Sequence, residues 1–167
     1  IALAADSMAA ALFELGSISE RRIDQMLDPA RSELPPFLAK NSGLESGLMI
    51  VQYVAGASLA ELHGHATPRA AFSTSTSAGQ EDHVSMGANA ATKSYKLINN
   101  LYSILAIELL TAAQAMDFRK PLKTSPYLQS FQDNFRDKIA FIENDRLLHD
   151  DLLKAEQFLN QLPSSIY

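Results

Sequence analysis

The order of apolar and polar positions predicts helices from the first residue onward. Over residues 1–13 the apolar side chains recur at roughly helical spacing, although Asp6 interrupts the run. We expect this helix to end near Gly16, because glycine is a frequent C-terminal breaker. A second helix is predicted over residues 17–28, where a serine and a glutamate three positions later form a capping-box pattern and a proline follows the last residue.

Residues 47–63 are apolar on nearly every side of a helix, and small residues gather in the middle of the segment. A helix that is apolar all round has to be surrounded by other protein. The apolar run is only marginally long enough to span a bilayer. We therefore predict a core helix here rather than a membrane helix.

Two long loops and one very long helix occupy the middle of the chain. Residues 28–47 are rich in Pro, Ser, Gly and Asn, and residues 63–83 contain a proline, glycines and a Ser/Thr run. The stretch 84–116 is helical again, which at 1.5 Å per residue makes a rod of about 45–50 Å. Such a rod exceeds the needs of a compact domain, so we expect it to pack against further chain or further subunits.

After a connecting loop over residues 118–130, two amphipathic surface helices are predicted at 131–145 and 150–162. Asp150 and Asp151 suit the N-terminal turn of the last helix, where negative charge is favourable. No strand pair and no internal repeat stands out. The predicted fold class is therefore all-α, a bundle of long helices in one segment over residues 1–167.

Composition narrows the classes of partner. With 14 Lys and Arg against 19 Asp and Glu, the net charge is −5, and no basic stripe is present. This balance argues against nucleic acid as a partner. The chain has no cysteine, which excludes disulfides, thiolate zinc sites and a thiol nucleophile. It is compatible with a reducing cytoplasm, which we predict as the location.

The start of the chain favours a fragment of a longer protein. There is no initiator Met, no basic lead-in of a secretory signal, and no capping residue before the first apolar positions. The alternative is a complete small protein whose Met has been removed.

The densest polar cluster is Gln80-Glu81-Asp82-His83, between a Ser/Gly-rich loop and the long apolar helix. Polar side chains on a loop at a helix N-terminus are well placed to face a cleft. There Glu81 acts as an acid or base, or accepts a hydrogen bond from a ligand N–H group. The alternative is a structural role, in which Asp82 and its neighbours cap the helix.

Other candidates are weaker. His63 and His65 are a poor metal site without a third ligand, and we predict no metal. Glu108 lies in an apolar helix and must be paired or face a polar cavity. A structural partner, such as an Arg or Lys from another helix, is favoured over a catalytic role.

The string SAGQEDHVSMG, from Ser77 to Gly87, resembles the SxxQEDHVSMG signature of histidine ammonia-lyases. NSGLESGLMIVQ at 41–52 and ILAIELLTAAQAMDFR at 104–119 are similar to the stretches before and after it in that family. IENDRLLHDDL at 142–152 resembles the C-terminal helical region. The resemblance covers essentially the whole chain in order and identifies it as the C-terminal part of the helical aromatic amino acid lyase fold.

This resemblance implies a large helical homotetramer that removes ammonia from L-histidine to give trans-urocanate. Its electrophile is a methylidene-imidazolone (MIO) formed from Ala-Ser-Gly, a tripeptide that this chain lacks. The MIO, the catalytic tyrosine and the carboxylate-binding arginine are expected upstream, so the segment alone should be inactive. Residues 1–117 are expected to hold the core helices and the active-site loop, and residues 118–167 the surface helices.

The resemblance also implies roles for individual residues. Glu81 corresponds to the glutamate that faces the substrate imidazole, where phenylalanine-specific relatives carry glutamine. Met49 corresponds to a methionine lining the ring pocket, and Tyr53 lies one helical turn further on the same face, in place of a smaller residue. Gln80 is expected to support Glu81, and His83 to be an interior residue that hydrogen-bonds nearby.

Two other functions remain open at this point. Within the family, a phenylalanine or tyrosine ammonia-lyase or an aminomutase is the runner-up, although Glu81 argues against the phenyl-specific members. A non-enzymatic helical oligomerisation module is the alternative outside it, and the missing Ala-Ser-Gly favours this for the chain as it stands. The remaining expected partners are the rest of the enzyme chain and its tetramer subunits, with no membrane.

Overall fold

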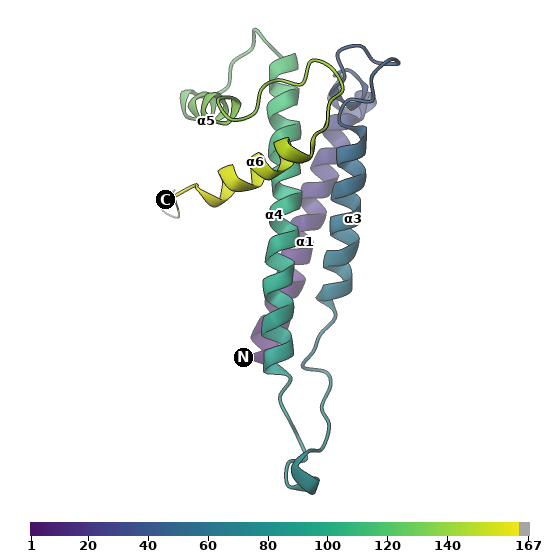
Figure 1. The fold of residues 1–167 in the computed structure, drawn as a ribbon, viewed down its shortest axis with the longest axis vertical. Helices are drawn as coiled ribbons and strands as arrows, with labels where there is room; N and C mark the ends of the chain where they lie inside the picture. The colour runs from purple at the N-terminus through teal and green to yellow at the C-terminus, as the bar shows by residue number, and fades with distance from the viewer. Residues whose placement is uncertain (164–167) are drawn as a thin grey trace.

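A computed structural model describes residues 1–163 of the chain, and within them every regular element is a helix. Three long helices lie side by side as a bundle: α1 (Ala2–Leu27), α3 (Met49–Ala66) and α4 (Gly87–Phe118). α1 and α4 run in the same direction and pack against each other, and α3 runs in the opposite direction beside both (Figure 1). Of two shorter helices, α5 (Pro126–Arg136) lies at the end of the bundle at which α4 finishes, and α6 (His149–Asn160) crosses α4 nearer its middle, where Ser103 donates to Glu156. The predicted all-α class is confirmed.

The first two predicted helices are one continuous helix, so the break expected at Gly16 is wrong. Gly16 is buried, and a Cβ built there would meet Ile104 of α4 at 3.4 Å and Leu62 of α3 at 3.5 Å. These are ordinary van der Waals distances, so the helix continues through Gly16 because the packing of α1 against both neighbours outweighs the low helix propensity of one glycine. Ser19, inside the expected capping segment, is buried in the helix instead. The predicted end before the proline is correct, since Asp28 is extended and follows the last helical residue.

The apolar LPPFL stretch in the loop that follows α1 predicts an ordered segment, and the loop does contain regular turns. It contains one short helix, α2 (Pro29–Ser32), and one 3-10 turn, η1 (Pro36–Leu38). Leu38 is buried against the bundle. The apolar residues of this loop therefore close the end of the bundle from which α3 starts.

α3 is apolar on nearly all sides but is buried on only one. Val51, Ala55 and Leu62 are buried, while Ile50, Tyr53 and Val54 are exposed. The expectation that protein surrounds this helix is therefore not met within residues 1–163. This exposed apolar face of α3 is the part of the helix for which the sequence predicts contacts with other protein.

α4 confirms the predicted long rod, because its 32 residues span about 48 Å at 1.5 Å per residue. Its buried face includes Leu97, Ile104, Ile107 and Leu110. Both α1 and α4 are apolar and long enough to cross a membrane by length and composition alone, and half of the relevant stretch of α4 is buried by its neighbours. The core helix of a globular protein has the same properties.

The C-terminal helices differ in part from the prediction. α5 begins at Pro126, earlier than the predicted residue 131, because Ser125 accepts a hydrogen bond from the Leu128 N–H and proline suits the first helical position. It ends at Arg136 rather than near 145. α6 lies where it was predicted, with Asp150 and Asp151 in its first turn.

One buried amide fastens the segment after α5 to the bundle. The Gln114 side chain is fully buried in α4, donates to the carbonyl oxygen of Ile142 at 2.9 Å and accepts from its N–H at 3.1 Å. Arg136 also donates to the Gln114 amide oxygen at 3.3 Å. We expect Gln114→Leu to cost about 2–3 kcal/mol, because both Ile142 backbone groups lose their partner while buried.

Chemical denaturation of the unaltered chain and of Gln114→Leu measures this loss in the free energy of unfolding. Gln129→Leu is the matched control, since the amide of Gln129 contacts only the exposed Asp133. An equal loss for Gln114→Leu and Gln129→Leu would show that the Ile142 contacts contribute nothing.

Candidate functional site

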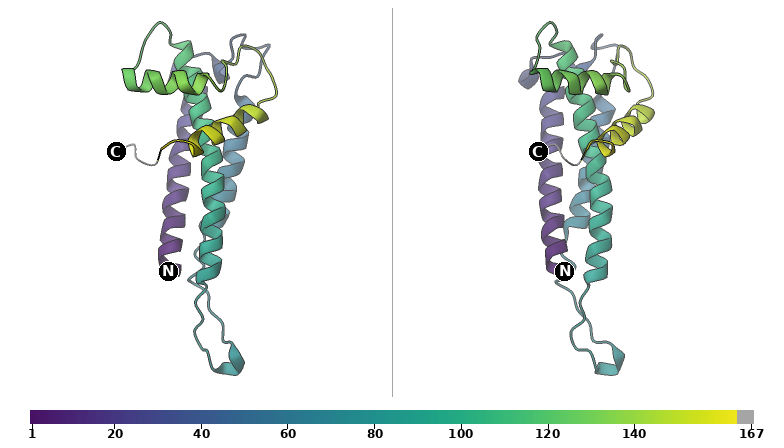
Figure 2. Two further views of the ribbon diagram at one scale, coloured as in Figure 1. Left: turned by 60° about the vertical axis from the view of Figure 1, so that its left-hand side comes forward. Right: turned by 90° about the vertical axis from the view of Figure 1, so that its left-hand side faces the viewer.

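The polar cluster found in the sequence lies in a loop that projects beyond the bundle. This projecting loop, residues 67–86, joins α3 to α4 and extends past the ends of the helices in all the views (Figures 1 and 2). Ser73 binds Val84 across it, accepting from the Val84 N–H at 2.8 Å and donating to its carbonyl oxygen at 3.1 Å. Nearer the tip, Thr76 and Glu81 pair through their backbones around the 3-10 turn η2 (Ser77–Gly79). The loop is therefore a narrow arm with cross-links along its length.

Glu81 occupies the tip of this arm and is exposed in the single chain. Its carboxylate accepts a hydrogen bond from the Thr76 hydroxyl at 3.3 Å. Glu81 is not at the start of a helix as expected, because α4 begins only at Gly87, with Met86 before it and no side-chain cap. The capping role proposed for Asp82 is therefore wrong. A carboxylate held at the tip by one neutral hydroxyl remains free to bind a group from outside the chain.

Gln80, expected to support Glu81, and His83, expected to be interior, make no side-chain hydrogen bond to Glu81 within the described residues. Gln80 is exposed, and its backbone N–H donates to Ser77. His83 is also exposed rather than interior, and it borders a shallow cavity of about 270 Å³ with Phe72 and Ile1 among its walls. Within the described residues, Thr76 takes the supporting position that the sequence assigned to Gln80.

The base of the arm is held by a buried ion pair that the sequence analysis missed. Lys93 of α4 and Asp6 of α1 are 4% and 7% exposed, and Lys93 Nζ lies 2.5 Å from Asp6 Oδ1. Asp6 Oδ2 accepts from the backbone N–H groups of Arg69 and Ala70 at 2.9 and 2.7 Å. Lys93 also donates to the carbonyl oxygen of Thr67 at 3.0 Å. The pair thus joins α1, α4 and the first residues of the arm.

These contacts make the pair sensitive to acid. The hydrogen bonds from Lys93 and from the Ala70 and Arg69 amides lower the pKa of Asp6 from 3.8 to about 2. A lowered carboxylate pKa stabilises the fold above the unfolded value, and this stability is lost as the pH falls from about 4 toward 2. We therefore expect the Tm difference between the unaltered chain and Asp6→Asn to be largest above about pH 5 and to shrink toward pH 2.

Thermal unfolding followed by circular dichroism across this pH range tests the expectation. A difference that stays constant with pH would mean that the ionised carboxylate of Asp6 does not stabilise the fold.

Met49 and Tyr53 lie at the other end of the bundle from Glu81. They line a cavity of about 450 Å³ together with Phe37, Gln52, Gly56 and Ala57. Tyr53 is 71% exposed and Met49 is half-buried, and both side chains border this cavity from the same side of α3. The length of α3 alone separates this cavity from the arm by roughly 25 Å. Within one chain, these two residues and Glu81 do not contact the same small molecule.

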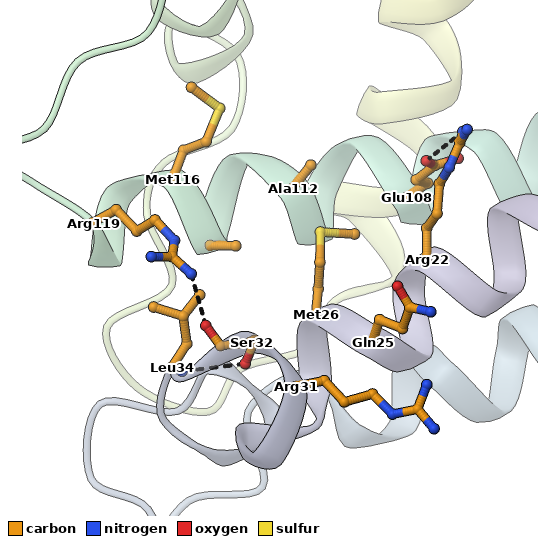
Figure 3. Close-up of a pocket in the computed structure, with 11 residues that line it drawn as sticks. Arg22, Gln25, Met26, Arg31, Ser32, Leu34, Glu108, Ala112, Met116 and Arg119 are labelled. Atoms are coloured by element: carbon orange, nitrogen blue, oxygen red, sulfur yellow. Dashed lines mark hydrogen bonds and ion pairs between the residues drawn. The ribbon is translucent and has the colours of Figure 1, made fainter.

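Glu108 has the structural partners that the sequence favoured. Ser19 donates to its Oε2 at 2.5 Å, and Arg22 Nη1 lies 3.3 Å from its Oε1, both from α1. Figure 3 shows this ion pair at the edge of a cavity of about 440 Å³ between α1 and α4, near Met26. The carboxylate is therefore engaged in fastening the two helices.

The two histidines of α3 have separate neighbours. The ring of His63 lies 5.3 Å from that of Phe13, and His65 Nε2 lies 3.7 Å from Glu61. Residues 1–163 contain no group of three His, Cys, Asp or Glu side chains placed to hold a metal ion.

Comparison with known proteins places the chain in a family. The family model for aromatic amino acid lyases matches residues 1–137. A histidine ammonia-lyase of Bartonella henselae is 48% identical over 162 residues, which are 96% of this chain and 32% of that protein. The chain thus spans about a third of the length of the curated relatives it matches.

Two solved structures of related enzymes also match nearly the whole of this chain. The crystal structure of histidine ammonia-lyase from Trypanosoma cruzi matches with a TM-score of 0.92 and 42% identity, over 95% of this chain and 31% of that one. Tyrosine aminomutase from Streptomyces globisporus matches with a TM-score of 0.88 and 33% identity, over 96% and 32% of the two chains. The chain belongs to the aromatic amino acid lyase family.

Proposed function

We propose that this chain is part of a histidine ammonia-lyase, which converts L-histidine to trans-urocanate and ammonia, and that Glu81 binds the substrate imidazole. The observation that carries the proposal is the exposed carboxylate at the tip of the projecting loop, within a sequence typical of histidine ammonia-lyases. The relatives at 42–48% identity that bear this name support it.

The chemistry of Glu81 favours an imidazole over a phenyl ring. A carboxylate accepts a hydrogen bond from an imidazole N–H, and such a charge-assisted bond contributes about 1.5–3 kcal/mol. A benzene ring offers no donor, so the same carboxylate would be left unpaired in the complex. Glu81 therefore selects for histidine both by binding it and by penalising the phenyl analogue.

The rest of the active site has to come from outside this chain. The sequence contains no Ala-Ser-Gly, so its own residues do not form the MIO electrophile, which belongs to the parent protein. The role of this chain is to bind and orient the ring. Because Met49 and Glu81 lie at opposite ends of the bundle, one pocket that uses both receives them from different copies, as in the homotetramer that we propose.

The main alternative is another member of the family. The likeness to the tyrosine aminomutase supports it, since the fold is shared and the identity is 33%. The carboxylate at position 81 argues against a phenyl-binding pocket, so histidine remains the preferred substrate. The non-enzymatic module remains an alternative for the chain in isolation. A cytoplasmic location follows from the proposed role in histidine degradation.

Incubation of the full-length parent protein with histidine, phenylalanine and tyrosine tests the proposal. We expect urocanate absorbance to rise with histidine, no comparable product from the other two amino acids, and no turnover by the 167-residue chain alone. Turnover of phenylalanine or tyrosine in place of histidine would support the alternative lyase or aminomutase. No turnover of any of the three by a folded parent would favour the non-enzymatic module.

A further inference from the structure

We propose that Asp6 and Lys93 are positioning residues that set the direction in which the projecting loop presents Glu81. The inference rests on the proposed function, because it assigns these two residues a task at the same site. Neither side chain reaches the tip of the loop, so both act through the backbone that they hold.

The hydrogen bonds between the loop and the helices beside it are concentrated at the base of the loop. Within residues 1–163, every hydrogen bond between loop residues 67–85 and helices α1 and α4 involves Asp6 or Lys93. The remaining bonds of those loop residues, such as Ser73 to Val84 and Thr76 to Glu81, run within the arm. Those internal bonds make the arm stiff, whereas the ion pair fixes its base.

The cross-linked arm converts movement at its base into movement at its tip. The cross-links at Ser73 and Thr76 transmit any rotation at residues 67–70 to the tip. A small change of angle at the base therefore becomes a larger displacement of the Glu81 carboxylate. Substrate-orienting groups tolerate such displacement poorly, since an error of about 1 Å costs up to a hundredfold in rate.

The chemistry of the Asp6–Lys93 pair also suits it to hold the base of the loop in one position. A buried charge is tolerated only with a partner, and two buried charges fix their neighbours in one arrangement. Asp6 uses both oxygens, one for Lys93 and one for the two loop amides. Ser94, the next residue of α4, is also buried, and its hydroxyl donates to the Ala90 carbonyl oxygen of its own helix at 2.9 Å while lying 3.4 Å from the Ala5 carbonyl oxygen of α1.

The test compares four forms of the full-length parent: unaltered, Asp6→Asn, Glu81→Gln and the double variant. If Asp6 acts through Glu81, Asp6→Asn lowers kcat/KM for histidine about tenfold relative to the unaltered protein. The double variant then differs from Glu81→Gln by less than about twofold. The Tm falls by the same amount in both backgrounds. Should Asp6→Asn assemble poorly, Lys93→Gln is measured in the same comparison, with the same pattern expected.

Asp151→Asn is the matched control. Asp151 is also 7% exposed and also paired, with Arg146 Nε at 2.9 Å, but it lies on α6, away from the arm. Its substitution should lower the Tm and leave kcat/KM unchanged.

Two results would overturn the inference: an equal loss of kcat/KM in both backgrounds, or a lower Tm with unaltered kinetics. Failure of the proposed function is visible separately. In that case the single variant Glu81→Gln turns over histidine like the unaltered protein, which removes the role of Glu81 and of its positioning residues together.

Discussion

If Glu81 binds the imidazole as proposed, Glu81→Gln in the full-length parent should lower kcat/KM for histidine about ten- to a hundredfold. The amide keeps the size of the side chain and its ability to accept a hydrogen bond, but it removes the negative charge. A charge-assisted bond to an imidazole N–H contributes about 1.5–3 kcal/mol, and each 1.4 kcal/mol corresponds to about tenfold. The initial rate of urocanate formation measures the effect.

Asp82→Asn is the matched control for this substitution. Asp82 is the neighbouring carboxylate of the same loop, is exposed, and caps no helix. We expect its loss to change kcat/KM by less than about twofold, because an exposed charge beside the site is screened by solvent. Equal losses for the two variants would mean that the charge of the loop matters, and not the contact of Glu81.

Phe135→Ala should have the largest effect on stability, about 3–5 kcal/mol. The Phe135 side chain is fully buried, and its ring meets that of Phe158 on α6 edge to face, with centroids 5.3 Å apart. Its removal leaves a cavity where α5 and α6 meet. Urea denaturation measures the loss, and hydrogen exchange should show faster opening of α5 and α6 than of α1, α3 and α4.

Phe131→Ala is the control here, since Phe131 contacts the same Phe158 ring at 5.4 Å but is only partly buried. Its loss should cost clearly less than that of Phe135. Uniformly faster exchange across all the helices would contradict a local role for Phe135.

Local patterns predicted most of the fold. The apolar spacing located the long helix α4, and the proline after Asp28 marked the end of α1. The sequence pattern gave a wrong prediction where contacts between helices, and not local preferences, determine the structure. Gly16 has a low helix propensity, but the buried contacts of α1 with α3 and α4 on either side of it outweigh that preference, so the helix continues through it.

The candidate site was predicted in part. A motif of adjacent residues, such as the one around Glu81, is readable in the sequence, and so is the face shared by Met49 and Tyr53. The pairing of Asp6 with Lys93 joins residues 87 positions apart and carries no local signal. The only hint was a charged residue within the apolar start of α1, whose partner depends on how the helices assemble.

The reach of the projecting loop has a consequence for genetics. On the proposed function, each catalytic centre combines the tip of the projecting loop from one copy with the α3 cavity from another copy. A substitution in the loop and a substitution in the cavity can therefore lie in different centres. Co-expression of a subunit altered at Glu81 with one altered at Met49 then yields mixed assemblies in which some centres inherit neither lesion. Such intragenic complementation, between two alleles each inactive alone, follows from an arm that extends beyond the body of its own chain.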